Sequence, residues 1–519
     1  MVRMRAARVA FALFLLFICL SCGETYRPVA FPIIPNPPNP GTFHFILALS
    51  GNGMNASDMI QPPTPGSTIR YDTSGDSVVG VVDTGAGPVH AAVLPNGSAW
   101  YAANSLEDTI TVSTTSASST RTTIALPDTP GDPTATPPVA PVFALPVFVH
   151  TTENGKVYVA NYNYGTVSVI NTSTNLVVAN VGVNPLAAVP DLAAHPVALA
   201  ELPNGQRVYS VNQGSGSVTS INTIDDSVGT VLSGVGSSPL SAAARSDSQR
   251  VYVLDSSSGN ISVIDPTTTP DTLIGSVSTA AGADFMLYDG QRNRLYVLSS
   301  GENALWAFDA SPSVPTPLLS APVSMVAPAQ SSDHPCAASV APTPVSLVAL
   351  PDGSRVYVAS FQKDTAGGNI CSQISVFSST NYAPGKVISL GSAGLVADTA
   401  HYPMGCDAAR PNAAGPPMGR RLSITSSADN KPTTRVYVAN CDQGNTSILT
   451  TVAINSAGEV FQPDSLITRI NAPLSAFPAP NPPLPVDGIC PNTGEPPLNG
   501  VCPQPPPPPQ NPLFIVAGP

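Results

Sequence analysis

Three histidines stand in similar places along the chain and could share a site. His195, His334 and His401 each lie next to a proline or one residue from it, and each has an aspartate close upstream. Those aspartates are Asp191, Asp333 and Asp398. Imidazole and carboxylate groups placed together can transfer protons, so these six residues form a candidate rim site. The alternative is a turn repeated by duplication, in which each histidine only bonds local backbone.

The motifs that usually mark catalysis or cofactor binding are missing from the sequence. It has no G-x-S-x-G elbow, no H-E-x-x-H zinc motif, no G-x-x-x-x-G-K-[ST] phosphate loop and no G-x-G-x-x-G turn. It also lacks paired C-x-x-C spacing with histidine nearby, which would suggest zinc. We therefore expect no catalytic residue, no cofactor and no metal ion.

The composition is that of a folded protein with an uncharged polar surface. Of 519 residues, 42% are hydrophobic, which is enough for a substantial core, and only 10% are charged. The net charge is −12, from 33 acidic and 21 basic residues spread along the chain. Because no basic stripe occurs, the sequence predicts no nucleic-acid partner.

Residues 1–21 have the layout of a secretory signal peptide. Arg3, Arg5 and Arg8 precede an apolar run over residues 9–20 that is too short to span a bilayer as a stable helix. The run ends in Cys-Leu-Ser-Cys-Gly, which resembles a bacterial lipobox and implies that Cys22 becomes the lipidated first residue. Ordinary cleavage nearby, leaving a soluble secreted protein, is the alternative.

A Pro-rich tether over residues 22–42 follows the leader. Such a segment is stiff and extended, and it would hold the folded part off a membrane. The resemblance to a lipobox implies an exported protein anchored by lipid to the cell envelope. The outer membrane is favoured, on its periplasmic or surface face, because Gly23 gives no inner-membrane retention signal of the Asp type.

A short motif repeats through most of the chain. Arg-Val-Tyr-Val or a close relative recurs around seven tyrosines, and most copies follow an apolar segment that ends in Pro-Asn-Gly or Pro-Asp-Gly. The tyrosines are Tyr101, Tyr158, Tyr209, Tyr252, Tyr296, Tyr357 and Tyr437. Asn-Gly and Asp-Gly supply the positive φ of tight hairpins, and the segments alternate β-branched and polar residues. Each unit therefore predicts four short strands that cannot bury both faces alone.

The segment Tyr158-Val-Ala-Asn161 and its repeats resemble the YVTN-type β-propeller repeat. The resemblance covers roughly residues 43–470, where strand, turn and spacing recur together. It implies an all-β fold in which four-stranded blades pack around an axis and close into a ring.

The two ends of the chain decide the number of blades. Residues 43–49, 68–72 and 78–82 look like the last three strands of a repeat that lacks its first, and 512–518 is a lone apolar strand. Pairing them would close the ring with eight blades, seven internal and one composite. Seven blades with an irregular N-terminal extension is the alternative. The predicted organisation is a propeller over 43–477, a Pro-rich loop over 478–511 and a closing strand over 512–519.

Six cysteines follow Cys22, an even number that suggests disulfides in an exported protein. They are Cys336, Cys371, Cys406, Cys441, Cys490 and Cys502. The first and third precede the first strand of their units, whereas the second and fourth follow the second strand of the same units. In an up-and-down blade the loops at these two positions emerge on the same face. The repeat therefore predicts Cys336–Cys371 and Cys406–Cys441, with Cys490–Cys502 closing the tail loop.

Function is predicted as a class, and two classes compete. The first is a non-catalytic envelope lipoprotein that binds protein, peptidoglycan or polysaccharide through one propeller face. The long loops over residues 127–141, 320–344 and 392–420 all precede first strands and gather on that face. Long loops on a rigid scaffold are where binding usually occurs.

The alternative is an exported enzyme of lactonase-like or haem d1-like type, since YVTN propellers are similar to such propellers. Relatives of that kind do chemistry at the central channel, where acidic or histidine side chains converge. The predicted inner strands offer only Glu201 as a carboxylate, so we expect the chain not to be an enzyme. A cluster of three or more acidic or histidine side chains lining the channel would favour the enzyme.

Overall fold

The residues that the computed structural model describes belong to one of two units of the chain. The chain divides into residues 1–37 and 38–519, and the described residues all belong to the second unit. They are 45–52, 65–73, 76–115, 121–127, 142–184, 192–280, 282–394, 406, 421–427, 435–451, 463–472 and 510–518.

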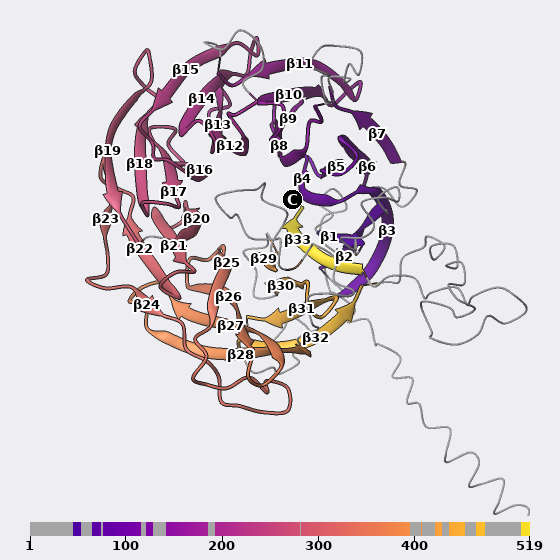
Figure 1. Cartoon of the computed structure of the whole chain (residues 1–519), viewed down its shortest axis with the longest axis vertical. Coiled ribbons are helices and arrows are strands. Elements are labelled where there is room, and N and C mark those ends of the chain that lie inside the picture. Colours follow the sequence, from indigo (N-terminus) through magenta and orange to yellow (C-terminus); the bar gives the residue numbers. More distant parts are fainter. Residues whose placement is uncertain are drawn as a thin grey trace, which may run out of the picture. The chain divides into compact units, whose positions relative to one another are not determined.

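The described residues form eight antiparallel sheets arranged in a ring (Figure 1). We name each blade by its first, innermost strand, except for the composite blade, and give strands from the inside outward. The composite blade contains β33 (Gln510–Ala517), β1 (Phe45–Asn52), β2 (Pro65–Asp72) and β3 (Ser77–Ala86). The β4 blade contains β4 (Pro88–Val93), β5 (Ala99–Asn104), β6 (Thr109–Thr114) and β7 (Arg121–Ala125). The β8 blade contains β8 (Pro146–Thr151), β9 (Lys156–Asn161), β10 (Thr166–Asn171) and β11 (Leu176–Gly182). The β12 blade contains β12 (Pro196–Glu201), β13 (Arg207–Asn212), β14 (Ser217–Asn222) and β15 (Val228–Ser233).

The other four blades continue the same order. The β16 blade contains β16 (Pro239–Ala244), β17 (Val251–Asp255), β18 (Asn260–Asp265) and β19 (Thr272–Ser278). The β20 blade contains β20 (Ala283–Asp289), β21 (Arg294–Ser299) and β22 (Ala304–Asp309), on which β23 (Thr316–Pro317) and β24 (Val323–Ser324) both pair. The β25 blade contains β25 (Thr343–Ala349), β26 (Arg355–Asp364), β27 (Asn369–Ser378) and β28 (Pro384–Gly394). The β29 blade contains β29 (Leu422–Ser426), β30 (Arg435–Asn440), β31 (Asn445–Thr450) and β32 (Ser465–Asn471).

The first strands form a closed inner layer. Each contacts the first strand of both neighbouring blades, in the order β33, β4, β8, β12, β16, β20, β25, β29 and back to β33. Figure 1 shows these strands nearest the centre of the ring, with the fourth strands around the outside. The predicted all-β propeller with eight blades is therefore confirmed, and the alternative of seven blades is wrong.

Ring closure uses both ends of the described chain, as predicted. The C-terminal strand β33 pairs antiparallel with β1, so that Leu47 faces Val516 and Leu49 faces Phe514. Leu513 and Ile515 of β33 are buried. The composite blade thus takes its inner strand from one end of the chain and its three outer strands from the other.

Strand alternation places each motif residue against a particular neighbour. Val157 and Val159 of β9 pack in a cluster with Tyr101 of the preceding blade. Tyr158 and Ala160, on the opposite face, pack in a cluster with residues of the following blade. Successive side chains of a strand point to opposite faces, so the motif buries both faces of the blade at once.

The motif tyrosine joins its blade to the next one. The Tyr158 hydroxyl donates to Asp226 Oδ1 at 2.9 Å, and Lys156 Nζ lies 2.8 Å from the same carboxylate. Asp226 is in the turn between β14 and β15, one blade further on. Lys156 and Tyr158 are two residues apart on β9 and therefore share the face that meets this turn.

The same contact recurs around the ring; we call it the tyrosine clasp. Tyr101 donates to Asn175, Tyr209 to Asp271, Tyr357 to Asp464 and Tyr437 to Asp76, each time in the turn between the third and fourth strands of the next blade. All seven motif tyrosines are fully buried. Burial raises the pKa of Tyr101 to about 12, so its hydroxyl stays protonated and can donate.

The acceptor residue of several clasps has a backbone conformation that few residue types adopt. The φ angles are 54° at Asn175, 59° at Asp226, 54° at Asp464 and 48° at Asp76. Among residues with a side chain, Asn and Asp tolerate this left-handed region best. A single residue therefore both turns the chain and presents the acceptor to the preceding blade.

The asparagine that ends the motif stabilises the next hairpin within the blade. Asn161 Nδ2 donates to Thr166 Oγ1 at 3.0 Å and to Ser168 Oγ at 2.7 Å, both on the third strand. Asn104 and Asn212 make the corresponding pairs of bonds in their blades. The motif thus makes side-chain hydrogen bonds at both of its ends.

Two of the three predicted disulfides lie within the described residues, and both are confirmed. Cys336 bonds to Cys371 and Cys406 bonds to Cys441. All four cysteines are buried. Cys490 and Cys502 lie outside the described residues, so the third pair stays a prediction, as do Cys22 and the predicted leader and tether.

Removing the closing strand should destabilise the whole ring. Deletion of residues 512–519 exposes the inner edge of β1 and removes the buried Leu513 and Ile515. We expect the melting temperature to fall by several degrees, measured by differential scanning calorimetry. The full-length variant Leu513→Asn/Ile515→Asn should show a similar loss, because burial of apolar side chains is the cause. An unchanged melting temperature in both variants would contradict closure by β33.

A second variant tests the tyrosine clasp. Asp226→Ala leaves the buried Tyr158 hydroxyl without its acceptor, whereas Lys156 Nζ keeps only the Thr223 carbonyl oxygen. We expect a loss of about 1.5–3 kcal/mol in the free energy of unfolding, measured by denaturant titration. Asp225→Ala is the matched control, because Asp225 is exposed and within the described residues hydrogen-bonds only to Ser227. Equal losses in the two variants would show that the clasp adds nothing.

Candidate functional site

The described residues of the predicted rim site do not come together. His195 precedes β12 and His334 precedes β25, so the first strands β16 and β20 lie between them in the ring. His195 stacks on Tyr162 with 4.3 Å between ring centroids, and its Nδ1 lies 3.0 Å from the Tyr162 carbonyl oxygen. His334 is buried, and its Nε2 bonds to Gln362 Oε1.

The aspartates of that predicted site are in different situations. Asp333 forms an ion pair with Arg469 of β32, at 2.7 Å. His401, Asp191 and Asp398 lie outside the described residues, and so do most residues of the loops 127–141 and 392–420. A rim site formed by all six residues stays a prediction.

The inner strands instead carry a histidine–carboxylate pair. His150 Nε2 of β8 lies 3.1 Å from Glu201 Oε2 at the end of β12. The two side chains retain 29% and 16% exposure, respectively, so solvent reaches the pair. Because β8 and β12 are neighbouring inner strands, the pair spans the junction of two blades.

An aromatic group lies beside this pair. The His90 ring of β4 stacks on Phe148 of β8, with 3.9 Å between centroids, and meets Phe514 of β33 at 4.3 Å. The backbone N–H of Val149 donates to His90 Nδ1 at 3.3 Å. Because Nδ1 accepts, the proton of a neutral His90 ring is on Nε2.

The strand pleat brings the histidine–carboxylate pair and the aromatic group to one side of the inner layer. Phe148 and His150 are two residues apart on β8 and so point to the same face. We call His90, Phe148, His150, Glu201 and Phe514 the inner-strand site. It draws on four successive inner strands, β33, β4, β8 and β12.

The sequence prediction missed most of these residues. It considered only the carboxylates of the predicted inner strands, so it recognised Glu201 and missed His90 and His150. Glu201 is also not the only inner-strand carboxylate, since β20 carries Asp284 and Asp289. Burial raises the pKa of Asp289, which accepts the backbone N–H of Gln291 at 3.0 Å in a turn. Asp289 therefore has a structural role in the hairpin that follows β20.

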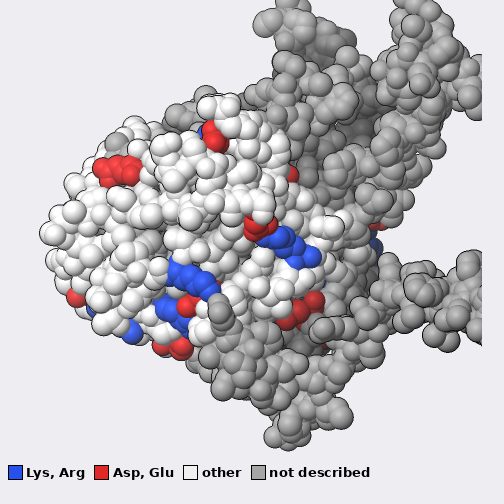
Figure 2. All heavy atoms as spheres, turned by 90° about the horizontal axis from the view of Figure 1, so that it is seen from below, with Lys and Arg blue, Asp and Glu red and all other residues white. Residues whose placement is uncertain are grey.

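The surface carries few charges. Figure 2 shows scattered Lys, Arg, Asp and Glu side chains on one face, without a continuous basic area. Among the described residues no group of three His, Cys, Asp or Glu side chains could hold a metal ion. Within the same residues no helix meets the length and apolarity needed to cross a membrane.

Comparison with known proteins finds similarity only among solved structures. No family model and no curated protein matches the chain. A *Bacteroides uniformis* structure provisionally named as a 6-phosphogluconolactonase is 13% identical, covers 67% of this chain and 98% of its own, and has a TM-score of 0.46. The *Pseudomonas aeruginosa* periplasmic gluconolactonase PpgL is 15% identical, with 68% and 97% covered and a TM-score of 0.46. At these values the similarity concerns the fold and carries no argument about the reaction.

The predictions of a non-catalytic binding module and of no enzymatic activity are wrong. The finding against them is that several of the solved structures that match the chain are named as lactonases. The inner strands also hold two histidines and a glutamate where the sequence offered only Glu201. The physical reason for the error is that the inner position of β4 and β8 follows from ring closure and not from local pattern.

Proposed function

We propose that this chain is an exported hydrolase of the lactonase-like type, with His150 as its general base. The observation that carries the proposal is the contact of 3.1 Å between His150 Nε2 and Glu201 Oε2 on adjacent inner strands. A carboxylate that accepts from one ring nitrogen fixes the tautomer, leaves the other nitrogen as the base, and stabilises the imidazolium that forms. His150 Nδ1 makes no hydrogen bond within the described residues, so it can accept a proton.

The reaction follows from this arrangement. His150 Nδ1 takes a proton from water as the water oxygen bonds to the carbonyl carbon of a lactone. The bond from that carbon to the ring oxygen then breaks, and the proton passes from His150 to the leaving oxygen to give a hydroxy acid. Glu201 remains a carboxylate throughout and offsets the charge on the imidazolium.

The aromatic group has a binding role in this proposal. His90, Phe148 and Phe514 present a largely apolar wall on the side of the inner layer that His150 faces. The Nε2–H of His90 is the one polar donor of this aromatic group. Small-molecule sites commonly combine an apolar lining with a few polar groups in this way.

The proposal is tested by hydrolysis of δ-gluconolactone, γ-butyrolactone and p-nitrophenyl acetate. His150→Gln should lower kcat/KM by about 100-fold or more, because general-base catalysis contributes about 10²–10⁴-fold. Glu201→Gln should lower kcat by at least about 10-fold while leaving KM nearly unchanged. Glu153→Gln is the matched control, since this carboxylate is exposed in the turn after β8. No hydrolysis of any substrate, or full activity in His150→Gln, would refute the proposal.

We also propose that the mature chain is a lipoprotein anchored through Cys22. The two disulfides support export, because such bonds form in oxidising compartments. Expressed with its leader, the chain should incorporate an alkyne-labelled palmitate and fractionate with membranes. Cys22→Ser should abolish both, whereas Cys19→Ser should keep both because Cys19 is removed with the leader. Labelling of the Cys22→Ser variant would count against the anchor.

A further inference from the structure

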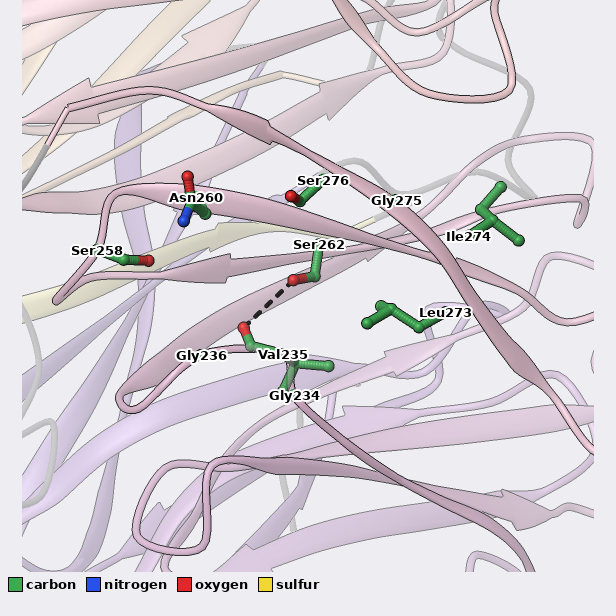
Figure 3. A pocket seen from close by; sticks show the side chains of 10 residues that line it. All are labelled: Gly234, Val235, Gly236, Ser258, Asn260, Ser262, Leu273, Ile274, Gly275 and Ser276. Atoms are coloured by element: carbon green, nitrogen blue, oxygen red, sulfur yellow. Dashed lines mark hydrogen bonds between the residues drawn. The ribbon is translucent and has the colours of Figure 1, made fainter.

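A pocket of about 410 Å³ lies where the outer parts of the β12 and β16 blades meet. One wall is the segment 234–236, which follows β15, and the other is formed by β18 and β19. Figure 3 shows Ser258, Asn260, Ser262 and Ser276 toward one end and Leu273 and Ile274 toward the other. The volume is within the range of about 300–1,000 Å³ that small-molecule sites occupy.

The repeats explain why the pocket opens at this blade. Ser262 lies on the third strand and pairs with Ser276 on the fourth. The fourth-strand residues at the same register in the other blades with a described pairing are Val81, Thr123, Asn180, Val231, Val387 and Arg469. Each of these side chains is larger than serine. The β16 blade therefore carries a smaller fourth-strand side chain at this register than its counterparts do.

The β8 blade shows what usually fills this space. There Asn180 accepts a hydrogen bond from Ser168 Oγ at 2.7 Å, so the polar groups of the two strands satisfy each other. In the β16 blade the exposed Ser276 hydroxyl makes no hydrogen bond within the described residues, and Ser262 Oγ donates across to the Val235 carbonyl oxygen at 3.3 Å. The shorter side chain leaves a hydroxyl facing the pocket with no partner from the described protein.

The segment 234–236 forms the opposite wall with little side-chain bulk. Gly234 has a φ of 83° and would have nothing within 4 Å of an added Cβ, so the space beside it is open. Gly236 has a φ of 124° and lies directly against Asp255, where a Cβ would come within 2.2 Å of the carboxyl carbon. Glycine at 236 is thus required by the close approach, whereas glycine at 234 leaves room.

The chemistry of the lining selects the kind of ligand. No Lys, Arg, His, Asp or Glu lines the pocket, which offers no counter-charge to an ionic ligand. The Ser258 and Ser262 hydroxyls donate to Asp255 and to the Val235 carbonyl oxygen, so toward a ligand they act as acceptors. The Ser276 hydroxyl and the Asn260 amide provide donors, and Leu273 and Ile274 provide an aliphatic surface. Asn260 Oδ1 already accepts from Ser278 at 2.9 Å, which fixes its NH₂ group as the donor left for a ligand.

We propose that this pocket is a binding site for a neutral saccharide, separate from the inner-strand site. Sugar rings present hydroxyl groups that pair with serine and amide groups, and C–H faces that pack on aliphatic side chains. The nearby buried Asp255 carboxylate adds to the preference for uncharged sugars over anionic ones. The proposal does not depend on the hydrolase activity, because its evidence is confined to the outer part of two blades.

The test is saturation-transfer NMR and titration calorimetry of the mature chain with maltose, cellobiose and N,N′-diacetylchitobiose. We expect at least one of these disaccharides to bind with a dissociation constant of about 10 mM or lower. Ser276→Asn, which restores the side chain found in the β8 blade, should raise that constant by about tenfold or more. Thr123→Asn makes the same change at the matching register of the β4 blade and should leave it unchanged.

A second variant distinguishes a loss of binding from a loss of folding. Asn260→Ala removes the amide donor without adding bulk, so it should weaken binding while melting temperature stays close to that of the parent chain. Three results would overturn the proposal. They are no binding by any of the three disaccharides, equal affinities in Ser276→Asn and Thr123→Asn, or tighter binding of glucose 6-phosphate than of the neutral sugars.

Discussion

The tyrosine clasp determines how one blade sits against the next. A hydroxyl on the second strand reaches a turn of the following blade across 62 to 107 residues of sequence, as at Tyr209–Asp271 and Tyr357–Asp464, and across 361 residues where Tyr437 meets Asp76. Where a Lys or Arg stands two residues earlier, as Lys156 and Arg435 do, it pairs with the same carboxylate. Each contact points from one blade to the next in the same direction. Repetition of one directed contact gives a constant rotation and therefore a ring.

The clasp also accounts for the similar shape of blades whose other residues differ. Because Tyr and Asp or Asn meet near one end of five blades, the inner and outer strands of those blades can vary without disturbing this contact. The inner layer accommodates His90, His150 and Glu201 as side chains that need not hold blades together. The outer layer accommodates Ser276, which opens a pocket between the β12 and β16 blades. Both candidate sites are therefore local departures from a repeat whose stability is supplied by other residues.

Much of the architecture could be predicted from the sequence, because the repeat is strong. The seven tyrosines locate the second strands, the Pro-Asn-Gly turns locate the first hairpins, and the unpaired ends predict the composite blade. The disulfides Cys336–Cys371 and Cys406–Cys441 followed from placing each cysteine within its unit. In each case a local signal was repeated often enough to be recognised.

The candidate sites could not be predicted in the same way. The acceptor of the clasp depends on a positive φ at Asp226 or Asp76, which the residue type alone does not specify. His150 and Glu201 are 51 residues apart and meet only because two inner strands are neighbours in the ring. Conversely, the recurring His–Pro segments suggested a shared site, yet His195 and His334 each bond within their own surroundings. Proximity created by ring closure has no local sequence signal.

The measurement that tests this account most directly is a double-mutant cycle at the closing interface, with Tyr437→Phe, Asp76→Asn and the pair combined. The two residues are 361 positions apart, and the Tyr437 hydroxyl lies 2.9 Å from Asp76 Oδ1. If the clasp closes the ring, the free energies of unfolding should show a coupling of about 1 kcal/mol or more. Losses that add within about 0.3 kcal/mol would mean that the residues do not meet, and the closed ring would be contradicted.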